Sequence, residues 1–134
     1  MIVEWKKEDS VGIVLMDEQH QKILNSLSTL YEEIENGKDI NKIEILFNKA
    51  GVDINSHLDS EEKYLENFGC EGLVEHKLMH NHYREMFLEL VKVYPEDFRN
   101  IPLPLVDMLG KWFKDHINFV DKRYTNCFHE HGLF

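Results

Sequence analysis

Seven potential metal ligands occur along the chain at spacings that match the turns of an α-helix. They form a lone histidine, a His-x3-Glu pair, a His-x3-His pair and a His-x4-Asp pair: His20; His57 and Glu61; His76 and His80; His116 and Asp121. Residues four apart lie on one face of a helix, one turn from each other. Each group falls in a different segment with the apolar periodicity of a helix, so the groups meet only if four helices converge. This pattern predicts an all-α fold, an antiparallel up-down-up-down four-helix bundle with an N-terminal arm.

Apolar periodicity, glycines and prolines divide the 134 residues into segments of one domain, 1–134. The arm is predicted at 1–16, with Trp5 as its anchor. The helices are predicted at about 17–36, 39–68, 73–94 and 105–129. Asp17 is the expected N-cap of the first helix, and Gly37 is expected to end it.

Two of the seven residues are carboxylates on apolar stripes that offer them no obvious lysine or arginine partner. Burying Glu61 and Asp121 would cost several kcal/mol each unless a cation is present. A lone histidine on an apolar face is usually a hydrogen-bonded core residue, but seven ionisable residues at one level of a core predict a metal site. Three further histidines, His82, His129 and His131, are expected not to be ligands because they lie off these stripes or at the end of the chain.

The last pair departs from the helical pattern. His116 and Asp121 are five residues apart, which corresponds to about 140° around an ideal helix. Either Asp121 reaches sideways, or the helix is locally distorted, for example by a π-bulge.

The number of ligands predicts two metal ions with one vacant coordination position. Five imidazoles, two carboxylates that each bridge both ions and one bridging oxygen from water leave one position open on a pair of octahedral ions. Such a histidine-rich site favours end-on binding of O2. Ferritin-like di-iron oxidases use more carboxylates, and zinc prefers about four ligands per ion.

These residues and their neighbours resemble the hemerythrin family, specifically its single-domain bacterial form, the bacteriohemerythrins. The resemblance covers nearly the whole chain and is carried by Trp5 and by the segments 17–20, 57–62, 76–80 and 116–124. It implies a cofactor of two Fe ions bridged by an oxo or hydroxo group and by Glu61 and Asp121. One iron would take His76, His80 and His116, and the other would take His20 and His57 and keep the open position.

The resemblance also implies reversible O2 binding for storage, delivery or scavenging, rather than an enzyme. An apolar O2 pocket would exclude water and anions from the O2-binding form, and the partners implied are O2 and, at the ferric site, azide or similar small anions. The family's pocket positions fall on Ile23, Leu58, Trp112, Phe113, Ile117 and Tyr124. The alternatives are a module that senses O2 or redox state, and a di-iron enzyme acting on peroxide or nitric oxide.

Composition narrows the partners and the location. A net charge of -10 and a pI near 5.2 argue against nucleic acid and against an anionic membrane surface. The apolar run 11–16 is too short to span a bilayer, and the N-terminus lacks a signal-peptide pattern, so a cytoplasmic location is expected. The oligomeric state is left open, with a monomer as the expectation.

The chain has two cysteines, Cys70 and Cys127, far apart in the sequence. They are expected to be reduced thiols, which suits the cytoplasm. Both would lie toward the same end of an up-down-up-down bundle, so a disulfide is geometrically conceivable.

Overall fold

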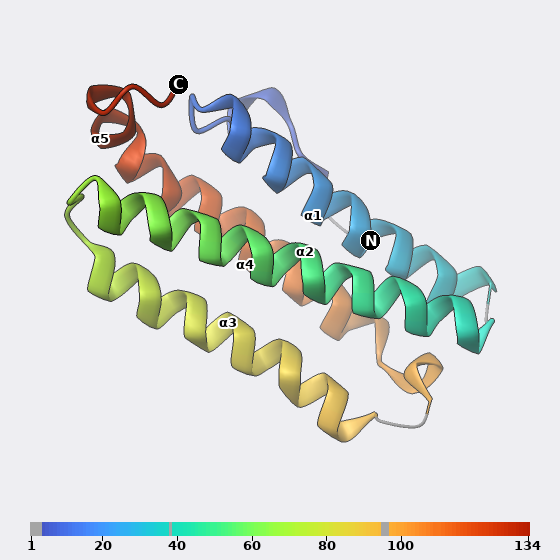
Figure 1. Ribbon diagram of the computed structural model, residues 1–134. Helices are drawn as coiled ribbons and strands as arrows, with labels where there is room; N and C mark the ends of the chain where they lie inside the picture. The colour runs from blue at the N-terminus through green and yellow to red at the C-terminus, as the bar shows by residue number, and fades with distance from the viewer. Residues whose placement is uncertain (1–3, 38, 95–96) are drawn as a thin grey trace.

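Four long helices lie side by side in the computed structural model, which describes residues 4–37, 39–94 and 97–134 (Figure 1). They are α1 (Val14–Glu32), α2 (Ile40–Asn67), α3 (Leu73–Val93) and α4 (Leu103–Phe119). The shorter elements are the 3-10 helices η1 (Lys7–Asp9), η3 (Phe98–Asn100) and η4 (Asp121–Tyr124), the π-helical turn η2 (Glu33–Gly37), and α5 (Thr125–Glu130). Successive long helices run in opposite directions, and the described residues contain no strand. The predicted all-α, antiparallel up-down-up-down bundle is confirmed.

The N-terminal arm packs on the bundle and ends before the predicted boundary, because α1 begins at Val14. Val11 is buried, and Trp5 is partly buried against the core. The prediction that Asp17 caps α1 is wrong, because Asp17 lies inside the first turn. Its carboxylate accepts hydrogen bonds from the Ser10 hydroxyl and, at 2.9 Å, from the backbone N–H of Val11. Asp17 therefore ties the arm to α1 instead of starting the helix.

The second helix is capped and continuous. The Asp39 side chain accepts hydrogen bonds from the backbone N–H groups of Asn41 and Lys42, as an N-cap does. A Cβ at Gly51 would lie 2.9 Å from the ring of Phe87, so the glycine lets α2 and α3 approach closely there. Gly51 therefore serves helix packing and leaves α2 unbroken.

The fourth predicted helix, 105–129, is not continuous, so that boundary is wrong. The α-helix α4 ends at Phe119, Val120 follows with φ −118° and ψ −56°, and η4 and then α5 come next. The local distortion expected between His116 and Asp121 is therefore present, as a 3-10 turn instead of a π-bulge. The break brings an Asp121 carboxylate oxygen to 3.0 Å from Nε2 of His116.

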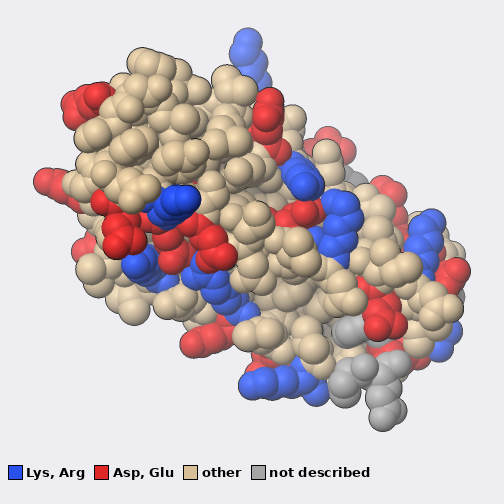
Figure 2. Space-filling view, in the orientation of Figure 1, with Lys and Arg blue, Asp and Glu red and all other residues tan. Residues whose placement is uncertain are grey.

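Apolar side chains from all four long helices fill the interior of the bundle. Tyr83 on α3 is fully buried, and its hydroxyl donates a hydrogen bond to the carbonyl oxygen of Leu109 on α4, 2.9 Å away. On the face shown in Figure 2, acidic and basic side chains are interspersed and form no continuous basic surface. Within the described ranges, no helix combines the length and the apolar character needed to cross a membrane.

A disulfide joins Cys70 and Cys127, so the expectation of reduced thiols is wrong. Cys70 follows α2, and Cys127 lies in α5. The helix order places both at one end of the bundle, as expected, and their Cα atoms lie 6.0 Å apart, a usual separation for a disulfide. The bond fastens α5 to the connection between α2 and α3.

The disulfide should contribute substantially to stability because it links residues 57 positions apart in the sequence. We expect the Cys70→Ser/Cys127→Ser variant to lose about 2–4 kcal/mol of unfolding free energy. Chemical denaturation of the oxidised protein and of the variant measures this loss. Dithiothreitol should produce a similar loss in the parent protein and none in the variant. If the parent and the variant were equally stable, both with and without dithiothreitol, the prediction would be contradicted.

Candidate metal centre

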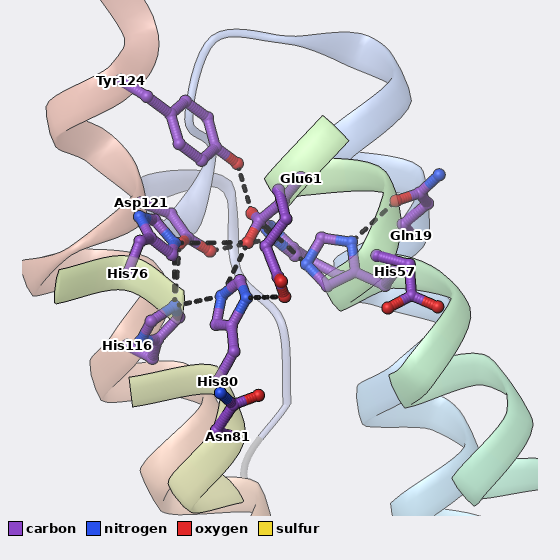
Figure 3. Close-up of polar contacts among 12 residues, drawn as sticks. Gln19, His57, Glu61, His76, His80, Asn81, His116, Asp121 and Tyr124 are labelled. Atoms are coloured by element: carbon purple, nitrogen blue, oxygen red, sulfur yellow. Dashed lines mark hydrogen bonds and ion pairs between the residues drawn. The ribbon is translucent and has the colours of Figure 1, made fainter. Parts of the chain in front are cut away.

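Seven ionisable side chains from the four long helices and η4 meet inside the bundle, and Figure 3 shows six of them labelled around one point. These are His20 on α1, His57 and Glu61 on α2, His76 and His80 on α3, His116 on α4 and Asp121 in η4. None is more than 5% exposed. The structure thus brings together all seven residues that the sequence singled out.

The seven residues form two groups that share both carboxylates. One group, the three-histidine group, consists of His76, His80, His116, Glu61 and Asp121. The other, the two-histidine group, consists of His20, His57, Glu61 and Asp121. Within each group, one nitrogen or oxygen atom per residue lies within 4.8 Å of all the others, close enough to surround one metal ion.

The three-histidine group has the spacing of metal ligands. Asp121 Oδ1 lies 2.9 Å from His76 Nε2 and 3.0 Å from His116 Nε2. Glu61 Oε1 lies 3.2 Å from His80 Nε2 and 3.4 Å from His76 Nε2. His116 Nε2 is 3.1 Å from that of His80 and 3.2 Å from that of His76. Neighbouring ligands of an octahedral ion with bonds of about 2.1 Å lie about 3.0 Å apart, so these five atoms fit such a sphere.

The two-histidine group uses the other oxygen of each carboxylate. Glu61 Oε2 lies 3.3 Å from His57 Nε2 and 3.5 Å from His20 Nε2. Asp121 Oδ2 lies 3.2 Å from His20 Nε2. Each carboxylate therefore presents one oxygen to each group, which is the arrangement of a bridging ligand.

Two histidines are held from outside by residues that the sequence reasoning missed. His57 Nδ1 lies 2.7 Å from Gln19 Oε1, and His80 Nδ1 lies 2.9 Å from Glu62 Oε2. Both oxygens accept hydrogen bonds, so each Nδ1 carries the proton and each Nε2 directs a lone pair into the cluster. Gln19 directly precedes His20, and Glu62 directly follows Glu61. A polar residue beside a ligand is the only sequence signal that could have indicated them.

The cluster contains carboxylates but no permanent positive charge. In the described part of the chain, Glu61 and Asp121 form ion pairs with histidines and with no lysine or arginine. Burial acts to lower the pKa of His20 and of His76, but contacts with the two carboxylates outweigh it and raise both values to about 9. Burial likewise acts to raise the pKa of Glu61, yet His57, His20 and His76 hold it well below its usual range. The carboxylates thus draw positive charge into the core.

Several buried atoms of the cluster have no hydrogen-bond partner. They are both ring nitrogens of His20, Nε2 of His57, Oε1 of Glu61 and Oδ2 of Asp121. Unpaired buried polar atoms are costly. Cations between them would remove this cost, so the donor set fits a pair of metal ions.

Tyr124 is a hydrogen-bond donor to the cluster. Its buried hydroxyl donates to Glu61 Oε2 at 2.6 Å, and its ring stacks on that of His76 with centroids 6.0 Å apart. Burial, together with the nearby carboxylates, raises the pKa of this phenol, which keeps it protonated as a donor. The sequence reasoning placed Tyr124 in an apolar pocket and did not foresee this contact.

Two of the other predicted pocket residues, Phe113 and Trp112, contact different parts of the cluster. The ring of Phe113 packs edge-on against His20 and His57, with centroids 5.6 and 5.7 Å apart, so it covers the two-histidine group. Trp112 instead stacks on His116 of the three-histidine group, at 5.0 Å. The remaining three are buried apolar side chains: Ile23, Leu58 and Ile117.

The three histidines predicted not to be ligands lie outside both groups. His82 is exposed. His129 contacts the carbonyl oxygen of Gly12 through Nε2 at 2.8 Å, and His131 stacks on the ring of Phe68. The last two histidines therefore pack the end of the chain against its neighbours.

Comparison with known proteins agrees with a metal-binding cluster in this bundle. The family model described as the Hemerythrin HHE cation binding domain matches residues 11–126. A bacteriohemerythrin of Clostridium acetobutylicum is 26% identical over 127 residues, which is 91% of this chain and 98% of the relative. One from Aquifex aeolicus is 27% identical over 121 residues, 87% of this chain and 90% of the relative. A crystal structure of a leucine-to-phenylalanine mutant protein, 21% identical, superposes with a TM-score of 0.84 over 93% of this chain and 95% of its own, and shows the same fold.

The hydrogen bond from Tyr124 should stabilise the metal-free protein. Tyr124→Phe keeps the ring stacking but leaves the buried Glu61 Oε2 without its hydroxyl donor. We expect a loss of about 1–3 kcal/mol in the free energy of unfolding, measured by chemical denaturation. Tyr64→Phe is the matched control, because it removes the hydroxyl of a partly buried tyrosine whose ring packs on Phe68 and Phe128. Equal losses in the two variants would count against the role given to Tyr124.

Proposed function

The chain belongs to the hemerythrin family, and we propose that its buried cluster holds two iron ions that bind O2 reversibly. The observation that carries this proposal is the pair of ligand groups that share both oxygens of Glu61 and of Asp121. The relatives named bacteriohemerythrin, which match nearly their whole length, support it further.

The donor set of the cluster as a whole suits iron. His76, His80, His116 and one oxygen from each carboxylate would hold one ion, and His20, His57 and the two other oxygens would hold the second. Imidazole and carboxylate donors suit iron, whereas the five ligand atoms of the three-histidine group exceed the tetrahedral set that zinc prefers. The two-histidine group offers one ligand fewer, so its ion would keep a position for a diatomic molecule.

When bound, the iron pair supplies the electrons and the open coordination position that O2 requires. The protein contributes the ligands and dry surroundings. Phe113 covers His20 and His57, and Ile23, Leu58 and Ile117 are at most 1% exposed. Excluding water and anions from this side of the cluster would favour release of O2 over irreversible oxidation of the site. This arrangement favours reversible binding over turnover of a substrate.

Anaerobic reduction followed by addition and removal of O2 tests the proposal. A visible absorption band should appear with O2, disappear when O2 is removed and return over repeated cycles. A band that never reverses would contradict reversible binding. Sustained consumption of hydrogen peroxide or nitric oxide by the reduced protein would favour a di-iron enzyme instead.

Loss of a ligand should remove iron. The parent protein should contain two iron ions per chain, and His80→Ala and Glu61→Ala should bind less iron and unfold at lower temperature, since the remaining buried ligands lose their partners. Iron analysis and thermal unfolding measure the two effects. His82→Ala is the control because His82 is exposed and lies outside both groups, so its iron content should equal that of the parent. Unchanged iron in the Glu61 variant would refute the assignment.

Opening the apolar cover should shorten the life of the O2-bound form. Phe113→Ala keeps every proposed ligand but admits water beside His20 and His57. The band produced by O2 should therefore decay faster, and azide should enter the oxidised site more quickly. Phe87→Ala is the control, since it truncates a buried phenylalanine that stacks on Phe47, at a similar cost of about 3–5 kcal/mol. If both variants decay alike, Phe113 is only a core residue.

A further inference from the structure

The two ligand groups are supported from outside by partners of different charge. His80, in the three-histidine group, contacts the carboxylate of Glu62 through Nδ1 at 2.9 Å. His57, in the two-histidine group, contacts the neutral amide of Gln19 through Nδ1 at 2.7 Å. The histidines that line the cluster are otherwise alike in using Nε2 toward its centre. The difference in outer partners therefore distinguishes the two groups.

Glu62 is fixed in place by a network that reaches the surface. Its Oε2 accepts hydrogen bonds from His80 and, at 2.7 Å, from Arg84 on α3. Arg84 also donates to Asn81 at 2.9 Å and to the exposed Asp59 at 2.8 Å. Glu62 and Arg84 are 16% and 19% exposed, so the pair is only partly screened by solvent. The network holds a carboxylate at a fixed distance behind one ligand.

We infer that Glu62 and Gln19 are positioning residues that make the two metal positions inequivalent, so that the three-histidine position binds a divalent ion first and more tightly. This inference rests on the proposed two-metal site. A carboxylate that accepts a hydrogen bond from the Nδ1–H group makes Nε2 a stronger donor and adds negative charge near the ion, whereas an amide orients the ring without that charge. Partners of this kind typically change metal affinity about 10–100-fold.

The number of ligand atoms, like the outer partners, favours tighter metal binding at the three-histidine position. The three-histidine group offers five ligand atoms, and the two-histidine group offers four. If the Glu62–Arg84 ion pair served only to link α2 to α3, a different result would be expected. Loss of that link would weaken both metal positions equally and lower the stability of the metal-free protein.

Anaerobic titration of the metal-free protein with Co2+ separates these possibilities, because the visible spectrum reports each ion as it binds. The parent protein should bind Co2+ in two steps. Glu62→Leu should weaken the first step about 10–100-fold and leave the second unchanged. Gln19→Leu should weaken the second step and leave the first.

Conservative exchanges separate orientation from charge. Glu62→Gln keeps an acceptor for His80 but removes the charge. The Co2+ affinity of its first step should therefore be lower than in the parent and higher than in Glu62→Leu. Gln19→Glu adds charge behind His57 and should tighten the second step, so the difference in Co2+ affinity between the two steps should become smaller. An unchanged difference in affinity in both variants would overturn the inference.

Asp53→Asn is the matched control for loss of a carboxylate between helices. Asp53 accepts a hydrogen bond from Ser26 on α1 and pairs with Lys49 on its own helix, away from the histidines. Both Co2+ steps of this variant should equal those of the parent. Equal weakening of both steps by Glu62→Leu would also overturn the inference. A parent protein that binds fewer than two Co2+ ions would instead refute the two-metal proposal, so the two failures are distinguishable.

Discussion

Two carboxylates buried among five imidazoles are the constraint on which the rest of this structure depends. Glu61 and Asp121 are fully buried, and each directs one oxygen toward each ligand group. In an apolar interior, such charges are tolerated only with compensating positive charge close by. The ligand-bearing faces of the four long helices are turned toward this point, and the apolar side chains above and below it form the core that holds them there.

The break after α4 follows from the same constraint. A continuous helix would place Asp121 about 140° away from His116, too far around the helix to share a site. Ending α4 at Phe119 and continuing as the 3-10 helix η4 brings the carboxylate to His116 and His76. The short α5 that follows is fastened at Cys127 by the disulfide. The irregular end of the chain thus positions a carboxylate that both ligand groups share.

The sequence predicted those features that depend on helical periodicity. His57 with Glu61, and His76 with His80, lie four residues apart on apolar stripes, so their common face and the bundle follow from spacing alone. Features set by tertiary distances were not predictable. The separation of Cys70 and Cys127 depends on how the helix ends pack, and the N-cap expected at Asp17 was wrong because the arm folds back to use that carboxylate. Gln19 and Glu62 follow no periodic pattern, since they support ligands from the side.

Several independent contacts make the three-histidine group the stronger donor set and the two-histidine group the weaker one. The three-histidine group has more ligand atoms and an anionic partner, Glu62, behind His80. The two-histidine group has fewer ligand atoms, a neutral partner behind His57, and a Glu61 oxygen that is shared with the Tyr124 hydroxyl. A hydrogen bond to that oxygen withdraws electron density, so the position with fewer ligands is also the more weakly donating one. Phe113 covers this same side, so the smaller number of ligand atoms, the hydrogen bond that weakens a donor oxygen and the apolar cover all lie at one end of the cluster.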